Sequence, residues 1–154
     1  YYGGDIGQLA LLNMMFPIGT ILGSFVMLWR GRLRRRGIAQ LVTLTSGALC
    51  LITIAQGLPL WGTLLAIVLW GMGAAVFVNA GRMIFQEHAP PSHRARVLAT
   101  YSFGFTGATG LLGAPLSGVF VKQYGPLTTC AIAGGSMIVV VACLVLFTNI
   151  RRME

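Results

Sequence analysis

Few side chains in this sequence could bind a ligand or take part in chemistry, and the most prominent of them lie inside long apolar runs. Asn79 and Arg82 follow Trp61 and Trp70 in one such run. A polar group inside a membrane-spanning segment is a functional candidate, because it has to be paired or solvated there. Arg82 stands close enough to the end of its run to reach the lipid headgroups or to pair with Glu87, so it has a structural explanation beside substrate binding.

A stripe of hydroxyl groups runs along a later apolar segment. At about 100° per residue its members fall on one face of a helix together with Gly113. They are Ser102, Thr106, Thr109 and Ser117. This face is expected to avoid lipid. It either lines an aqueous cavity or forms hydrogen bonds with a neighbouring helix, and the sequence alone leaves both open.

The other reactive side chains form no catalytic or metal-binding pattern. The acidic residues are Asp5, Glu87 and Glu154, and none lies deep in an apolar run, so no carboxylate of this chain is placed to carry a proton across a membrane. The histidines stand in a short polar segment and the cysteines in different apolar runs, and they are His88, His93, Cys50, Cys130 and Cys143. The sequence therefore predicts no enzyme activity, no metal and no cofactor.

The segments that carry these residues are long and uncharged. Of the 154 residues, 56% are hydrophobic and 9% are charged, whereas a soluble domain has about 25% charged residues. A helix needs about 20 apolar residues to cross a bilayer, and Gly57-Leu58-Pro59 divides one overlong run into two. The sequence predicts an all-α membrane protein with five transmembrane helices, at about 8–29, 38–56, 59–82, 97–121 and 127–149.

Basic residues indicate the orientation of these helices. The stretch from Trp29 to Gly37 reads WRGRLRRRG, and with five spans it lies on the same side as residues 82–96 and the C-terminal tail. Ten arginines fall on this side and Lys122 on the other, the arginines being Arg30, Arg32, Arg34, Arg35, Arg36, Arg82, Arg94, Arg96, Arg151 and Arg152. The positive-inside rule makes this side cytoplasmic, C-terminus included. The cluster is expected to contact anionic lipids, and so short a loop offers nucleic acid little surface.

Small residues and prolines recur in two of the predicted helices. The helix at 8–29 contains Pro17, Gly19 and Gly23. The helix at 97–121 contains a larger set, namely Gly104, Ala108, Gly110, Gly113, Ala114, Pro115 and Gly118. Small residues at four-residue spacing let membrane helices approach closely, and a proline kinks its helix. Close packing and kinks suit a bundle that moves, although both residue types are frequent in membrane helices generally.

Residues 85–118 carry a more specific pattern, FQEHAPPSHRARVLATYSFGFTGATGLLGAPLSG. This segment resembles the loop and helix between the tenth and eleventh helices of the major facilitator superfamily, in particular its drug and small-molecule exporters. The matching residues are Gln86, Glu87, Pro90, Arg94 and Arg96, with Ala95 in place of the family's glycine. The segment from Gly23 to Arg36 resembles the loop between helices eight and nine, without the aspartate that helps to latch the family's cytoplasmic gate. The resemblance assigns to the cytoplasmic loops and gate Arg32, Arg35, Arg36, Glu87, Arg94 and Arg96.

The resemblance covers nearly the whole chain and implies helices eight to twelve of a twelve-helix secondary transporter. The helix at 59–82 then corresponds to the family's central tenth helix, and the implied substrate-binding residues are Trp70, Asn79, Ser102, Thr106 and Thr109. Such carriers work by alternating access, in which two six-helix halves expose a midplane site to each side in turn. The implied function is export of a small amphipathic molecule across a bacterial inner membrane.

The sequence starts with Tyr1-Tyr2-Gly3-Gly4-Asp5, in which neither an initiator methionine nor a signal-peptide pattern is visible. We therefore expect this chain to be a fragment that begins within an extracytoplasmic loop and does not transport by itself. The N-terminal half and the seventh helix of the transporter are then expected upstream of it. The alternative is a membrane scaffold or assembly subunit that transports nothing. Glycine-rich helix interfaces and a basic loop would suffice for such a protein.

Overall fold

The computed structural model describes residues 6–31, 36–90 and 92–147, and nearly all of them are helical. In chain order the elements are α1 (Ile6–Arg30), α2 (Arg36–Ala55), α3 (Leu60–His88), α4 (Arg94–Gly107), the π-helix η1 (Ala108–Gly113), α5 (Ala114–Tyr124) and α6 (Pro126–Phe147). The segments α4, η1 and α5 form one continuous span. Within the described ranges there is no strand, and five helical spans are long and apolar enough to cross a membrane. The expected all-α membrane fold is confirmed.

Glycine and proline determine where several helices end. Gly31, Gly57 and Gly125 follow α1, α2 and α5 with φ of 71°, 74° and 80°, a conformation that closes a helix and that residues with a β-carbon rarely adopt. α3 ends for another reason. Pro90 disfavours helical backbone in the residue before it, and Ala89 is extended, with φ −83° and ψ 130°.

Two spans extend beyond their predicted ends by three residues or more. α3 reaches His88 rather than 82, and the fourth span covers Arg94–Tyr124 rather than 97–121. The predicted ends were placed beside charged residues, where a helix leaves the hydrocarbon. A helix continues beyond that boundary because its backbone hydrogen bonds are internal. The predicted end of the last helix, at 149, lies outside the described residues.

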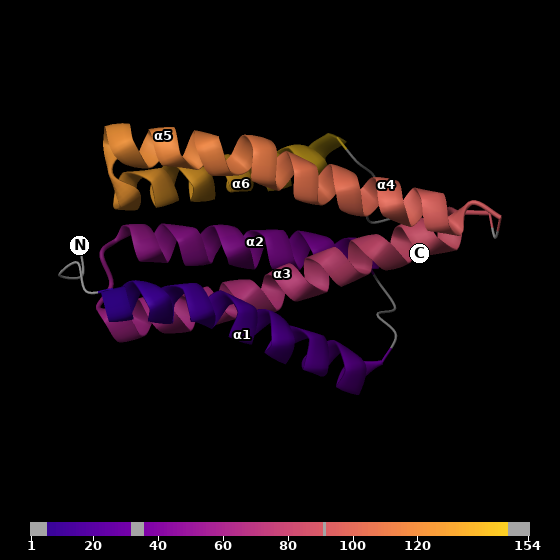
Figure 1. The fold of residues 1–154 in the computed structure, drawn as a ribbon, viewed down its shortest axis with the longest axis horizontal. Helices are drawn as coiled ribbons and strands as arrows, with labels where there is room; N and C mark the ends of the chain where they lie inside the picture. Colours follow the sequence, from indigo (N-terminus) through magenta and orange to yellow (C-terminus); the bar gives the residue numbers. More distant parts are fainter. Residues whose placement is uncertain (1–5, 32–35, 91, 148–154) are drawn as a thin grey trace.

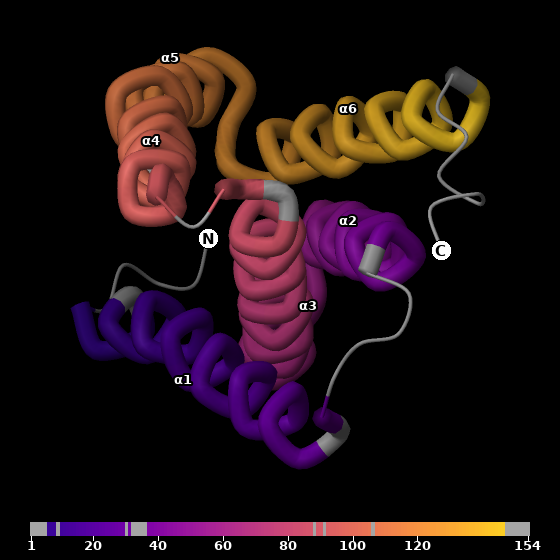
Figure 2. Tube along the Cα trace, turned by 90° about the vertical axis from the view of Figure 1, so that its right-hand side faces the viewer, coloured from indigo at the N-terminus to yellow at the C-terminus, as the bar shows by residue number. Residues whose placement is uncertain are grey.

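α3 is the central helix of the bundle (Figure 2). It packs mainly against α1 and α2, and α2 also packs against α6. These crossings are close because glycines lie at them. A β-carbon built on Gly23 would lie 2.6 Å from the carbonyl oxygen of Met72, and Gly19 meets the α3 backbone in the same way. Between α6 and α2, a β-carbon on Gly134 would lie 3.0 Å from the carbonyl oxygen of Ala48.

Many large apolar side chains are exposed on the outside of the bundle. Its described buried residues are mostly small: besides glycines, they are Ala48, Leu51, Leu64, Ala66, Ala75, Ala80, Ala89 and Thr63. Trp61 at the start of α3 is 78% exposed, and Phe103 in α4 is 82% exposed. Such an apolar exterior is expected of helices packed in lipid, where large apolar side chains gain little by turning inward.

The bundle has two distinct ends, because successive spans run in opposite directions (Figure 1). One end carries Arg82 in the last turns of α3, together with Arg94 and Arg96 at the start of α4. Lys122 lies near the end of α5, at the opposite end of the bundle. The described part of the fold therefore keeps these arginines apart from the lysine, as the charge pattern predicts.

Candidate functional site

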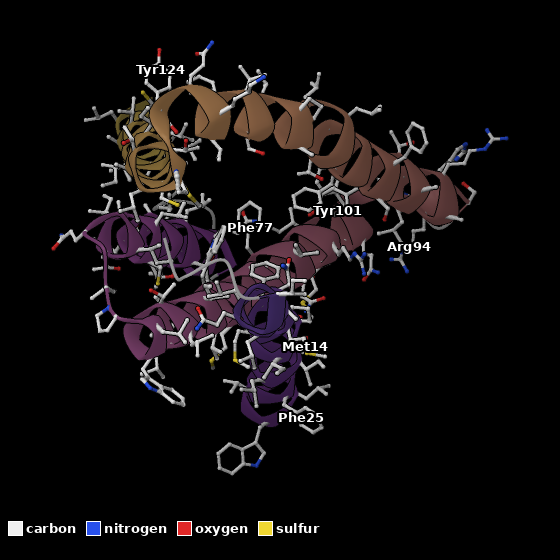
Figure 3. All side chains as sticks on the ribbon, turned by 60° about the vertical axis from the view of Figure 1, so that its left-hand side comes forward. Met14, Phe25, Phe77, Arg94, Tyr101 and Tyr124 are labelled. Atoms are coloured by element: carbon white, nitrogen blue, oxygen red, sulfur yellow. The ribbon has the colours of Figure 1, made fainter. Side chains whose placement is uncertain are left out.

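Three helices meet at Tyr101, near the arginine-bearing end of the bundle. Tyr101 of α4 places its phenol oxygen over Gly81 of α3, and a β-carbon built on Gly81 would lie 2.7 Å from Tyr101 Oη and 3.4 Å from Gln40 Nε2 of α2. The phenol ring contacts Phe85 and Phe105, with centroid distances of 4.9 Å and 6.1 Å. Figure 3 shows Tyr101 on the side of α4 toward α3. This junction attaches α4 to the described bundle.

Trp70, a predicted substrate residue, also lies at a helix junction. Its half-buried indole makes an edge-to-face contact with Phe16 of α1, with the ring centroids 5.3 Å apart. A β-carbon built on Gly47 of α2 would lie 3.3 Å from Trp70 Nε1 and 3.3 Å from Met137 Cε of α6. Trp70 therefore has a packing role where α1, α2, α3 and α6 come together.

The other predicted polar residues of α3 lie in its second half. Asn79 is half-buried and stands two residues before Gly81, whereas Arg82 and Glu87 are exposed. Arg82 is nearer to the end of the helix, where its long side chain can extend into the headgroups. Of these three, Asn79 lies deepest in the span.

The predicted hydroxyl stripe falls on α4, η1 and α5. Thr109 Oγ1 donates to the carbonyl oxygen of Phe105 at 2.8 Å, and Ser117 likewise donates within its own helix. Ser102 is half-buried, and the side chain of Thr106 lies outside the described part of the structure. A hydroxyl that donates to its own helix needs no second helix to satisfy its proton, so it can face a cavity at little cost.

The glycine-rich face of this span is open. No residue of η1 or α5 is buried, and a β-carbon built on Gly110, Gly113 or Gly118 would meet no described atom within 4 Å. The main contacts of η1 are with α4 and α5 alone. Among the described residues, close packing at predicted small positions is therefore found at Gly19 and Gly23 and not at these three glycines.

The two prolines predicted to kink their helices differ in their surroundings. α1 continues through Pro17, and the Thr20 hydroxyl donates to the Pro17 carbonyl oxygen at 2.7 Å. Pro115 is the second residue of α5 and follows η1 directly. A proline lacks an N–H and crowds the carbonyl four residues earlier, which here belongs to Leu111. The irregularity expected at Pro115 takes the form of a π-helix.

Arg94, one of the predicted gate residues, binds the end of α3. Its Nε donates to the carbonyl oxygen of Ala89, the residue that closes α3, at 3.4 Å. A cation at this position is favoured by the helix dipole and by the unpaired carbonyls of the last turn. The remaining predicted gate arginines are placed as follows: Arg96 is exposed, Arg36 begins α2, and Arg32 and Arg35 lie outside the described residues.

Sequence patterns do not single out two residues that the structure makes prominent. Tyr101 stands four residues before Phe105, a spacing that puts both rings on one helix face and could have indicated an aromatic contact. Gln8 of α1 has a buried Oε1 without a hydrogen-bond partner in the described structure, and a glutamine in an uncharged run is itself a signal. The described residues contain no group of three His, Cys, Asp or Glu side chains that could hold a metal ion.

Comparison with protein families accounts for nearly the whole chain. The family model described as Major Facilitator Superfamily matches residues 1–153. No curated protein and no solved structure matches the chain. The matched range includes all five spans and the loops that connect them.

Proposed function

Because the chain belongs to the major facilitator superfamily, a family of membrane transporters, we propose that it forms helices eight to twelve of a secondary transporter that exports a small amphipathic molecule. Transport proceeds by alternating access, with a substrate site at the midplane between two six-helix halves. The observation that carries the proposal is the family match across all five apolar spans. Export, rather than import, follows the resemblance of residues 85–118 to exporters.

The open face of the α4–η1–α5 span supports the placement of a further helix beside it. The glycines of this face meet no described atom. α3 packs mainly against α1 and α2, and α6 packs mainly against α2, rather than α3 and α6 packing against each other. A small-residue face in lipid is suited to a closely packed neighbour. We assign this position to the seventh helix, in a part of the transporter upstream of Tyr1.

We place the substrate at the midplane between the two halves of the transporter, where α3 and the α4–η1 segment contribute side chains to the site. Asn79 offers an amide, Ser102, Thr106 and Thr109 offer hydroxyls, and Trp70 offers an aromatic surface at the helix junction. Uncharged hydrogen-bonding groups set among apolar side chains suit a ligand that is itself partly apolar and partly polar. In this assignment the site selects its substrate by shape and hydrogen bonding.

The orientation is also part of the proposal. We place the end that carries Arg82, Arg94 and Arg96 at the cytoplasmic face of a bacterial plasma membrane, with the C-terminus on the same side. The position of Lys122 at the opposite end supports this orientation. Contacts with anionic lipids of the inner leaflet then account for the basic charge, and no nucleic-acid partner is needed to explain it.

Efflux from cells tests the proposed function. Cells that express the intact transporter are loaded with ethidium, an amphipathic cation, without an energy source, and fluorescence is followed after glucose is added. The proposal predicts faster loss of ethidium than in cells with an empty vector. A rate equal to that of the vector cells, for ethidium and for a panel of neutral and cationic dyes, would contradict export and favour a membrane scaffold.

A further inference from the structure

We propose that η1 is a hinge at which α5 changes its direction relative to α4 when the transporter alternates between its two states. The purpose of the hinge rests on the proposed function. The bending of this membrane span at η1 can be measured without any substrate. The argument depends on the backbone of η1, on the absence of described neighbours around it, and on the different attachments of α4 and α5.

The backbone of η1 already departs from the α-helix. A π-helix bonds each N–H to the fifth preceding carbonyl, and the N–H of Ala114 donates in this way to the carbonyl oxygen of Thr109. Pro115 has no N–H to offer and crowds the carbonyl before it, so it favours a wider turn at this place. Short π-helical segments within α-helices frequently mark functional sites.

No described helix holds η1 straight. A β-carbon built on Gly107, Gly110 or Gly113 would meet no described atom within 4 Å, and no residue of η1 is buried. Glycine lacks the side chain that restricts other residues to one backbone conformation. A bend at η1 therefore breaks no side-chain packing with the described part of the bundle.

The two arms of the span are attached to different helices. α4 is held to α3 by Tyr101, which contacts Phe85 and lies over Gly81. α5 is linked to α6 by the turn at Gly125 and packs against it. Figure 1 shows α4 beside the end of α3 and α5 beside α6. A change in the angle between α3 and α6 is therefore taken up between α4 and α5, at η1.

Spin-label distances in the intact transporter test the hinge. Cys50, Cys130 and Cys143 are first replaced by alanine, and labels are then introduced in pairs at exposed positions. One pair, Leu65 of α3 and Val119 of α5, reports the α5 arm. The other pair, Arg82 of α3 and Phe103 of α4, reports the α4 arm. Distances measured by double electron–electron resonance in lipid nanodiscs should show two components for the first pair and one for the second.

A straightened span provides the comparison. The triple variant Gly110→Ala/Gly113→Ala/Pro115→Ala favours an unbroken α-helix, and the added β-carbons at 110 and 113 meet no described atom. We expect the 65–119 distribution to lose one of its two components, while the 82–103 distribution stays unchanged. The control, Gly104→Ala/Gly135→Ala, adds methyl groups at open positions outside η1 and should leave both distributions as in the wild type.

A wild-type 65–119 distribution with one component overturns the hinge, as do two components that persist in the triple variant. If the triple variant does not fold, the wild-type distribution and the single variant Pro115→Ala decide the matter in the same way. Distances do not depend on transport. If the wild-type 65–119 distance distribution has two components but the protein exports no dye, the proposed function is refuted and the hinge stands. If the protein exports dye but the distribution has one component, the hinge is refuted and the proposed function stands.

Discussion

Tyr101 Oη occupies the space over Gly81, where a β-carbon would approach it to 2.7 Å. The lack of a side chain at Gly81 is thus what allows α4 to approach α3 near the arginine-bearing end. Tyr101 directly precedes Ser102, so the same contact positions the start of the hydroxyl stripe. A change at Gly81 is therefore expected to affect both the stability of the bundle and the proposed substrate site.

Gly81→Ala is expected to destabilise the intact protein by about 1–3 kcal/mol, the usual effect of an extra methyl group in a packed site. The measurement is thermal unfolding of the purified protein in detergent. Tyr101→Phe removes the oxygen that the new methyl group meets, so the double variant should regain most of the lost stability. Gly104→Ala, at an open position of α4, is the control. Strictly additive effects of the two substitutions would contradict the contact.

The neighbouring glycines Gly134 and Gly135 of α6 should respond differently to the same substitution. A β-carbon on Gly134 would lie 2.8 Å from Ile52 Cγ1 and 3.0 Å from the Ala48 carbonyl oxygen, whereas one on Gly135 would meet no described atom within 4 Å. Gly134→Ala should lower stability by about 1–3 kcal/mol. Gly135→Ala should be neutral or raise it by up to about 1 kcal/mol, through helix propensity. Equal effects in thermal unfolding would refute this α2–α6 packing.

Thr109→Val should lower efflux while leaving membrane abundance unchanged, because valine keeps the shape of threonine and removes its hydroxyl. We expect a loss of about tenfold if one hydrogen bond to the substrate disappears. Thr45→Val is the matched control, since Thr45 is also exposed and its Oγ1 also donates to the carbonyl four residues earlier at 2.8 Å. Efflux that falls equally in both variants would remove Thr109 from the site.

The orientation predicts which positions are accessible from outside the cell. In a cysteine-free background, Ser92→Cys in the α3–α4 loop should react with a membrane-impermeant maleimide only after the cells are opened. Lys122→Cys near the end of α5 should react in intact cells. Both side chains are exposed in the structure, so burial does not hide either one. Reaction of Ser92→Cys in intact cells would reverse the topology.

The number and place of the spans could be predicted because lipid imposes strict conditions on them. Charge is excluded from the hydrocarbon, and backbone groups there need internal partners, so long uncharged runs indicate helices. The same reasoning placed the end of α3 too early. A charge such as Arg82 marks the edge of the membrane, whereas the helix itself continues until Pro90 prevents it.

The contacts between helices could not be predicted in the same way. Gly19 and Gly23 have the same spacing as Gly110 and Ala114. In the described structure the first pair lies against the α3 backbone, whereas neither residue of the second pair is buried. The difference depends on where the helices cross, which local patterns do not encode. For the same reason the family resemblance indicates Trp70 as a substrate candidate but not its position against Phe16, and the sequence does not indicate the Tyr101 junction.

Access to one residue from both sides of the membrane tests the account most directly, since it needs no knowledge of the substrate. Thr109→Cys in the cysteine-free intact protein is treated with impermeant maleimide in whole cells and in inside-out vesicles, with Thr45→Cys on α2 as the control. Alternating access predicts that Thr109→Cys reacts from both sides and that Thr45→Cys reacts from neither. Absence of reaction at Thr109→Cys from both sides would contradict a transport pathway along this span.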